Sequence, residues 1–492
     1  MERRADAGEQ KVVGLGLGLG LGLGLGGVGQ AVVTTWWNQV VRVVGWVMAV
    51  LTTTAKAPVA REVPRPGPAR TVIAERDRRA GETLFGPDEK DSSRGALLCT
   101  DPDAAPDPRS STSWETPMPL VSWTENDAVQ SARWRSENGA PPPVTVEIAD
   151  DTLTANAALR HLRAGSSLLW RGDFHNARQL LKAVSRRIDH GSISRKLGIS
   201  ALFRAHRAER AERSQVLGGI VVLLEPGGRL ALRRAPDIAD ACREAYGELE
   251  EPTLVSLTEL QGVLSAYQWH EQGVPVPALG ARIHPRHSVF SPSRSEYVDL
   301  VARVPLPTTR EQLTAFDIGT GTGVLAAVLA RRGVVNVVAT DVNPRAVESA
   351  RENIERLELT SAVTVIETDL FPPGRADLVV CNPPWLPGTP TSALELGIYD
   401  DGSTMLRGFL AGLADHLTPG GEGWLVLSDL AEHLELRSRD ELRRLIRRAG
   451  LEVAGEDSTT PRHGRAADAL DLLHAARRQE VTTLWRLRAK AA

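Results

Sequence analysis

The chain has 492 residues, of which 42% are hydrophobic and 24% charged, so it is long enough for two globular domains with extensions. Its three cysteines, at positions 99, 242 and 381, are too widely spaced for a disulfide framework or a zinc site, which indicates a reducing, cytoplasmic location. Its histidines lack the tight spacing of metal ligands, so no metal is expected, and a net charge of −3 singles out no class of partner.

Residues 1–143 are expected to form a low-complexity, disordered extension and linker. Within it, residues 12–51 contain a Gly-Leu repeat and an apolar stretch, so a membrane anchor or signal segment is the alternative. Asn38 and Arg42, near the middle of the apolar stretch, would be costly in lipid, and glycines weaken a helix by roughly 1 kcal/mol each. We therefore favour the disordered extension.

Residues 144–275 are expected to form a smaller, mainly helical accessory domain. Apolar side chains recur at helical spacing over residues 152–213, and a Glu-Pro-Gly-Gly turn between residues 216–224 and 229–232 indicates a β-hairpin. Residues 160–213 hold 13 basic and four acidic side chains. Such a surface could meet RNA phosphates or an acidic ribosomal partner, and a plain solvated helical face is the alternative.

The most informative motif lies in the third segment, residues 276–492. Residues 314–318 read as a short buried strand, and residues 324–332 as the helix that follows. The turn between them contains Gly319, Thr320, Gly321 and Gly323. Glycine allows positive φ and a close approach of the backbone to a ligand. A glycine turn that opens a helix after a strand is typical of sites for nucleotide-like ligands.

An acidic residue follows this turn at a distance that suits a ribose. A second apolar run, residues 334–340, ends in Asp341, and Asn343 then opens the next helix. An acid at the end of a second strand, about 20 residues after the glycine turn, is placed to accept both ribose hydroxyls. NAD and S-adenosylmethionine both fit this spacing. Asp317 favours S-adenosylmethionine, because an acid beside the turn would repel a pyrophosphate but suits the ammonium group of a methionine.

A compact polar and aromatic motif follows a later strand. Residues 376–381 form the fourth strand candidate, and the residues directly after it are Asn382, Pro383, Pro384 and Trp385. The carbonyls of Asn382 and Pro383 could accept both hydrogens of a planar NH2 group at the carboxyl end of this strand, where ligands bind in open α/β sheets. Trp385 could stack on a flat amide or base. An ordinary Asn-Pro-Pro turn is the alternative.

With both motifs in place, residues 316–385 resemble class I S-adenosylmethionine-dependent N-methyltransferases, including release-factor glutamine N5-methyltransferases and small-domain ribosomal-RNA methyltransferases. The resemblance implies S-adenosyl-L-methionine as cofactor and a seven-stranded Rossmann-like α/β sheet with helices on both faces. The residues expected to bind the cofactor are Asp317, Gly319, Thr320, Gly321, Gly323, Asp341, Asn343, Asp369 and Asn382. The acceptor would be held by Asn382, Pro383, Pro384 and Trp385.

Two other stretches bear on this resemblance. Residues 290–297 are similar to a Pro-Arg-rich segment that the glutamine enzymes carry before their first strand. Those enzymes have Tyr where this chain has Trp385, so the indole keeps the stacking face but moves the polar atom. Residues 386–401 are expected to form a mobile loop over the acceptor. The remaining elements are expected as helices over residues 402–417 and 436–450 and strands over residues 422–428, 451–454 and 481–487.

The sequence therefore predicts an S-adenosylmethionine-dependent enzyme that methylates a planar nitrogen. The acceptor is a glutamine amide of a protein or the exocyclic amine of a nucleic-acid base, and a ribosome-associated protein or RNA is the expected partner. The basic accessory domain favours RNA, whereas the segment at residues 290–297 favours a protein amide. The alternatives are a binding module that keeps the fold without catalysis and an enzyme for a small molecule. No residue is assigned as a general base.

Overall fold

The computed structural model describes residues 118–188, 193, 196–308, 311–461 and 471–490. The expectations for residues 1–117, including the membrane question over residues 12–51, lie outside these ranges. Among the helices within the described ranges, none combines the length and the apolar character needed to cross a membrane.

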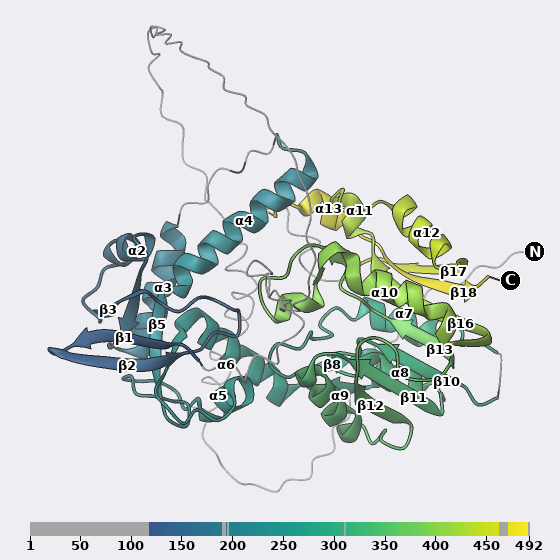
Figure 1. The fold of residues 1–492 in the computed structure, drawn as a ribbon, viewed down its shortest axis with the longest axis horizontal. Coiled ribbons are helices and arrows are strands. Elements are labelled where there is room, and N and C mark those ends of the chain that lie inside the picture. Colours follow the sequence, from purple (N-terminus) through teal and green to yellow (C-terminus); the bar gives the residue numbers. More distant parts are fainter. Residues whose placement is uncertain (1–117, 189–192, 194–195, 309–310, 462–470, 491–492) are drawn as a thin grey trace, which may run out of the picture. The chain divides into compact units, whose positions relative to one another are not determined.

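A mixed β-sheet forms the centre of the accessory domain (Figure 1). Its strands are β1 (Leu120–Glu125), β2 (Ala128–Trp134), β3 (Thr145–Ala149), β4 (Ser166–Trp170), β5 (Ile220–Glu225), β6 (Arg229–Leu230) and β7 (Thr253–Ser256). They pair in the order β1-β2-β7-β5-β4-β3, and β6 pairs with β5 as the expected hairpin. Strands β1 and β2 lie in the stretch expected to form a disordered linker, so the sheet also includes residues that precede position 144.

Helices cover one face of this sheet. They are α2 (Ala155–Arg163), α3 (Phe174–Arg187), α4 (Ile199–Gly218), α5 (Ala239–Tyr246) and α6 (Leu257–Gln272). Successive strand residues point to opposite faces: Leu168 packs with the helices, whereas Leu169 joins a second cluster with Trp123 and Trp134. Because Trp123 and Trp134 are buried, β1 and β2 belong to the core of the domain.

A short antiparallel pair precedes the C-terminal domain. It consists of β8 (Val274–Val276) and β9 (Ala281–Ile283), with the 3-10 helix η1 (Pro277–Leu279) between them. The domain boundary expected at residue 276 thus falls at the end of β8. Helix α7 (Glu296–Arg303) follows and packs on the next sheet.

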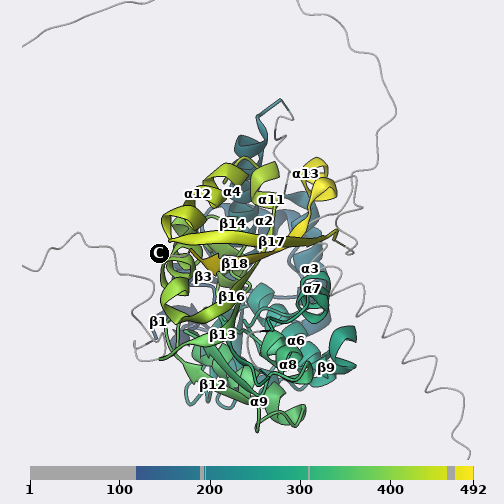
Figure 2. The same ribbon diagram turned by 90° about the vertical axis from the view of Figure 1, so that its right-hand side faces the viewer.

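A second seven-stranded sheet forms the C-terminal domain (Figures 1 and 2). Its strands are β10 (Thr314–Ile318), β11 (Asn336–Asp341), β12 (Val363–Glu367), β13 (Ala376–Cys381), β16 (Leu417–Ser428), β17 (Leu451–Thr459) and β18 (Thr482–Ala489). They pair in the order β12-β11-β10-β13-β16-β18-β17, and β18 is antiparallel to both of its neighbours. Along the chain, β10, β11 and β12 follow one another toward one edge of the sheet, and β13 and β16 then continue from the other side of β10 toward the opposite edge. The strand order therefore reverses between β10 and β13.

Helices lie on both faces of this sheet. Their bounds are α8 (Val324–Arg331), α9 (Pro344–Arg356), α10 (Thr404–Leu413), α11 (Leu430–His433), α12 (Arg439–Arg448) and α13 (His474–Gln479). Apolar side chains of α7, α8 and α9 pack on one face, and those of α10 and α12 on the other. The predicted α/β fold with a seven-stranded Rossmann-like sheet is therefore confirmed.

The segment after the Asn-Pro-Pro-Trp motif has more regular structure than the mobile loop expected there. Strand β14 (Leu386–Pro387) pairs in parallel with β15 (Tyr399–Asp400), and the 3-10 helix η2 (Leu394–Gly397) lies between them. The Asp400 carboxylate then accepts hydrogen bonds from the amides of Met405 and Leu406, at 3.0 and 3.1 Å. It thereby caps the first turn of α10.

Candidate functional site

The two sequence motifs meet where the strand order reverses. Ile318, the last residue of β10, is the sheet partner of Cys381, the last residue of β13. The glycine turn and the Asn-Pro-Pro-Trp motif therefore leave the sheet side by side, beginning with Gly319 and Asn382. Ligands of open α/β sheets bind outside the carboxyl ends of the strands at such a reversal.

The glycine turn has a backbone shape that other residues rarely adopt. Gly319, Gly321 and Gly323 have φ angles of +68°, +58° and +80°. The amide of Thr320 donates to the carbonyl of Thr340 on β11 at 2.8 Å, which ties the turn to the neighbouring strand. A Cβ atom added to Gly321 would meet no heavy atom within 4 Å, so open space lies beside the backbone there.

Asp317, in strand β10, fixes the conformation of this turn through hydrogen bonds. Its Oδ2 atom accepts hydrogen bonds from the Thr320 hydroxyl at 2.6 Å and from the Ala326 amide at 3.0 Å. The side chain is buried, and burial raises the pKa of this carboxyl to about 6. The structure thus shows Asp317 as a brace between the turn and α8. Its role as partner of an ammonium group stays a prediction.

Asp341 lies at the carboxyl end of β11 and faces the same turn. Its Oδ2 atom accepts from the Gly321 amide and its Oδ1 atom from the Asn343 amide, both at 2.9 Å. Burial raises the pKa of this carboxyl as well, although these two amides oppose the shift. Each carboxylate oxygen has a second lone pair, so Asp341 can accept further hydrogen bonds from a ligand.

Asn343 and Asp369, which are also predicted to bind the cofactor, lie on the same edge of the sheet. The Asn343 side chain accepts from the Arg345 amide at 3.1 Å, so it caps α9. Asp369 is exposed and follows β12, and the neighbouring Thr368 amide donates to the carbonyl of Asp341 at 3.1 Å. The structure brings these positions together along the ends of β10, β11 and β12, while their contacts with a cofactor stay predictions.

The Asn-Pro-Pro-Trp motif is folded on itself. The indole Nε1–H of Trp385 donates to the Asn382 side-chain oxygen at 2.8 Å. Pro383 is buried beside them, whereas Asn382, Pro384 and Trp385 are half-buried. Asn382 and Trp385 therefore form one polar and aromatic unit directly after β13.

Two arginines that the sequence prediction did not single out hold this unit. The guanidinium carbon of Arg294 lies 4.8 Å from the centre of the Trp385 ring, over its face. Arg294 is itself fixed by Glu296 at 2.9 Å and by Glu480 at 2.8 Å, both buried carboxylates. Arg437 donates to the Trp385 carbonyl at 3.3 Å. Arg294 lies in the Pro-Arg-rich segment noted in the sequence, whereas no local pattern distinguishes Arg437.

A third arginine reaches the segment that follows Trp385. Arg207, on α4 of the accessory domain, donates to the Thr389 carbonyl at 2.9 Å and pairs with Glu395 at 3.1 Å. Its guanidinium carbon lies 3.7 Å from the centre of the Tyr399 ring. The accessory domain therefore supports the β14–β15 segment beside the acceptor motif, a contact that only tertiary structure reveals.

The C-terminal part of the chain is similar in sequence to known methyltransferases. Residues 280–449 match the family model described as the methyltransferase small domain. A release factor glutamine methyltransferase from Moorella thermoacetica is 38% identical over 125 residues, which are 23% of this chain and 44% of that protein. A tRNA1(Val) (adenine(37)-N6)-methyltransferase from Bacteroides thetaiotaomicron is 30% identical over 128 residues, which are 24% of this chain and 54% of that protein. The chain spans about half the length of these two curated relatives.

A solved structure is also similar. The SAM-dependent methyltransferase from Thiobacillus denitrificans, in complex with S-adenosyl-L-homocysteine, is 15% identical, and the match covers 41% of this chain and 92% of that one with a TM-score of 0.29.

The strand order and the glycine turn agree with the match of residues 280–449 to the methyltransferase small domain, and together they indicate an S-adenosylmethionine-dependent methyltransferase. Its cofactor is S-adenosyl-L-methionine. The residues present fit this cofactor, because open space lies beside Gly321 of the turn, next to the carboxylate of Asp341 at the reversal of strand order.

Proposed function

We propose that the protein transfers a methyl group from S-adenosyl-L-methionine to a planar nitrogen, either the amide of a protein glutamine or the exocyclic amine of a nucleic-acid base. One observation carries this proposal. Ile318 and Cys381 are sheet partners, so the glycine turn for the cofactor and Asn382 for the acceptor begin at adjacent strand ends. This adjacency suits a transfer that depends on positioning two bound molecules.

On the cofactor side, the backbone of the glycine turn allows close approach, and the Asp341 carboxylate accepts hydrogen bonds from ribose hydroxyls. When bound, S-adenosyl-L-methionine supplies an electrophilic methyl group on a sulfonium sulfur. Asp317 keeps the turn in place through Thr320 and Ala326. Its buried carboxylate also favours a cationic ligand close by, because burial in a low dielectric strengthens such an attraction.

On the acceptor side, the side-chain carbonyl of Asn382 and the backbone carbonyl of Pro383 accept the two N–H groups of the acceptor. This arrangement keeps the nitrogen lone pair directed at the methyl group. Trp385 provides a flat apolar surface for an amide or a base, with Arg294 behind its ring. The buried surroundings of Pro383 exclude water from one side of the site.

Both classes of acceptor find support among the relatives. By their names, one modifies glutamine in a release factor and another modifies adenine N6 in a tRNA. Each of these acceptors presents a planar NH2 group with a delocalised lone pair, which is the feature that Asn382 and Pro383 would recognise.

The proposal is tested in two stages with the full chain. Isothermal titration of S-adenosyl-L-methionine should show binding for the wild type and for Asn382→Ala, and its loss for Asp341→Ala. Asp415→Ala removes an exposed carboxylate elsewhere in the same domain and should bind like the wild type. No binding by the folded wild type at millimolar cofactor would overturn the proposal.

The second stage follows transfer of a labelled methyl group to a glutamine-containing peptide and to a single-stranded RNA that contains adenine. The wild type should label one of them, and Asn382→Ala should lower the rate at least a hundredfold, the scale reported for loss of one key polar group in a transition state. Labelling that persists undiminished in Asn382→Ala would remove Asn382 from the acceptor site.

A further inference from the structure

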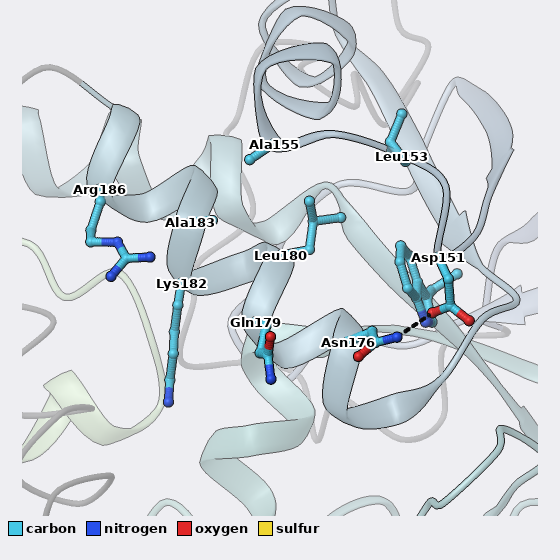
Figure 3. A pocket seen from close by; sticks show the side chains of 10 residues that line it. Asp151, Leu153, Ala155, Asn176, Gln179, Leu180, Lys182, Ala183 and Arg186 are labelled. Atoms are coloured by element: carbon cyan, nitrogen blue, oxygen red, sulfur yellow. Dashed lines mark hydrogen bonds between the residues drawn. The ribbon is translucent and has the colours of Figure 1, made fainter.

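The accessory domain contains a pocket that the proposed chemistry does not use (Figure 3). Its volume is about 510 Å³, within the range of sites for small organic groups. It is lined by Asp151, Leu153, Ala155, Trp170, Asn176, Gln179, Leu180, Lys182, Ala183 and Arg186. The apolar members can receive a flat ring, and the polar members come mostly from α3.

The acids near this pocket are already engaged. Asp151 accepts from the Asn176 side chain at 3.0 Å and from the Asp173 amide at 2.9 Å, and it also pairs with Arg233. Asp173 pairs with Arg234 at 2.6 Å. The negative charge at this end of α3 is therefore neutralised by arginines that lie outside the helix.

Three basic side chains of α3 lie on one face of this helix. Arg178, Lys182 and Arg186 follow one another at intervals of four residues, so they lie on one face, and the sequence of α3 contains no Asp or Glu. Burial lowers the pKa of the Lys182 ammonium, and the flanking Arg178 and Arg186 lower it further. Like charges at this spacing destabilise a helix by roughly 0.2–0.5 kcal/mol per pair. Arg178 also lies over the Phe174 ring, 5.8 Å from its centre, and Arg186 is exposed, so the row can present positive charge to a polyanion.

We propose that this pocket and the row formed by Arg178, Lys182 and Arg186 bind single-stranded RNA. The cationic row contacts the phosphates, and one base enters the pocket between Leu153 and Ala183. The amide groups of Asn176 and Gln179 line the same pocket, and side-chain amides can read a base edge. An acidic protein would match the charge but would have no use for a ring-sized pocket with amide groups. This site lies on α3, outside the methyltransferase domain, and the proposal does not rest on methyl transfer.

The test measures binding of the full chain to a fluorescein-labelled 12-nucleotide RNA by fluorescence anisotropy, without cofactor and over a range of salt concentrations. The triple variant Arg178→Gln, Lys182→Gln, Arg186→Gln should bind roughly tenfold or more weakly near physiological salt. The slope of log affinity against log salt should fall by about 2, since each lost phosphate contact to a single strand contributes about 0.7.

A matched control removes the same charge from a helix of the other domain. Arg444, Arg447 and Arg448 are exposed on α12, so Arg444→Gln, Arg447→Gln, Arg448→Gln should leave both affinity and slope unchanged. Equal weakening by the two triple variants would show general charge attraction and overturn the proposal.

A second variant separates the pocket from the charges. Ala183→Trp fills the pocket without changing charge and should weaken RNA binding while leaving the salt slope as in the wild type. Asp341→Ala should bind RNA normally, so failure of the methyl-transfer proposal would be distinguishable. The proposal is overturned if the folded wild type does not bind the RNA, if Ala183→Trp binds it normally, or if a polyglutamate peptide competes as well as unlabelled RNA does.

Discussion

The indole Nε1–H of Trp385 donates a hydrogen bond to the side-chain oxygen of Asn382 at 2.8 Å. This oxygen is the one that the proposed function assigns to an acceptor N–H group. An amide oxygen has two lone pairs, so Trp385 leaves one for the acceptor and fixes the direction in which it points. Trp385 thus orients the side chain of Asn382 in this chain.

Replacing Trp385 by Phe should separate orientation from stacking. The phenyl ring keeps a flat apolar face, but the hydrogen bond to Asn382 is lost, so kcat should fall roughly fivefold, as expected for one hydrogen bond worth about 1 kcal/mol. Cofactor affinity should be unchanged. The measurement is steady-state methyl transfer to the acceptor that the labelling experiment identifies. An unchanged kcat would show that the bond between Trp385 and Asn382 has no part in the reaction.

The glycine turn makes a prediction about stability. Gly323 has φ of +80°, and a Cβ added there would meet Ala350 atoms at 3.3 Å, so Gly323→Ala should lower the free energy of unfolding by about 1–3 kcal/mol. Gly262 lies within α6 with nothing within 4 Å of an added Cβ and without positive φ. Gly262→Ala should therefore raise it by about 0.5–1 kcal/mol. Urea unfolding of both variants checks the pair, and equal effects of the two changes would contradict the strained geometry of the turn.

Two central strands of the C-terminal sheet could be predicted from the sequence. The bounds of β10 and β13 were predicted as the structure has them, because buried parallel strands are short apolar runs between polar turns. The spacing of the glycines and of Asp341 predicts a cofactor turn, but it does not predict the hydrogen bonds that Thr320 donates to Asp317 and Gly321 donates to Asp341. Asn382 directly follows β13, as the sequence predicts, while its role in holding the acceptor stays a prediction.

Strands β1 and β2 of the accessory domain could not be predicted from the sequence. In β1, buried Val121 and Trp123 alternate with exposed residues, but an alternation this short is a weak signal beside a long Pro- and Ser-rich stretch. Its sheet also depends on the pairing of β2 with β7, which local patterns do not reveal. The same limit applies to Arg207 and Arg437, because their positions beside the acceptor motif come from distant parts of the chain.

The contacts of His270 predict that the stability of the fold depends on pH. Its Nδ1 atom lies 2.5 Å from Glu244 and its Nε2 atom 3.0 Å from Glu352. The hydrogen bond with Glu244, and then that with Glu352, raises the pKa of His270 although burial opposes the shift. Burial raises the pKa of Glu352, but hydrogen bonds from His270, Arg356 and Arg286 outweigh it and lower the value to about 2.

The directions of these two pKa shifts define the pH range in which the ion pair between His270 and Glu352 stabilises the fold. A histidine with a raised pKa contributes stability below its unfolded value of 6.5, and this stability is lost as the pH rises through the higher folded pKa. Glu352 contributes above its unfolded value of 4.5 and loses its contribution as the pH falls toward 2. The wild type should therefore exceed His270→Gln in stability by roughly 1–3 kcal/mol between about pH 5 and 6.5.

Above this window the difference should shrink. Urea unfolding at several pH values measures it, with His175→Gln as the control, since His175 is exposed on the first turn of α3. A difference between wild type and His270→Gln that stays constant up to pH 9 would argue against a charged His270.

Arg207 predicts a local effect on the segment beside the acceptor motif. Arg207→Ala removes the contacts to Thr389, Glu395 and Tyr399. Hydrogen–deuterium exchange of residues 386–401 should then be faster by roughly tenfold, while cofactor affinity stays the same. Arg204→Ala changes an exposed side chain on the same helix and should leave the exchange as in the wild type. Unchanged protection in Arg207→Ala would show that α4 does not support this segment.

The pairing of β2 with β7 has a consequence for biosynthesis. Arg133 and Trp134 pair with Thr253 and Leu254, which the ribosome adds about 120 residues later. At roughly 5–20 residues per second, the hairpin of β1 and β2 is made about 6–24 seconds before its partner strand exists. During that interval the side chains of Trp123 and Trp134 lack their final neighbours. The nascent chain therefore exposes an apolar surface, which is the kind of surface that chaperones bind, until β7 emerges.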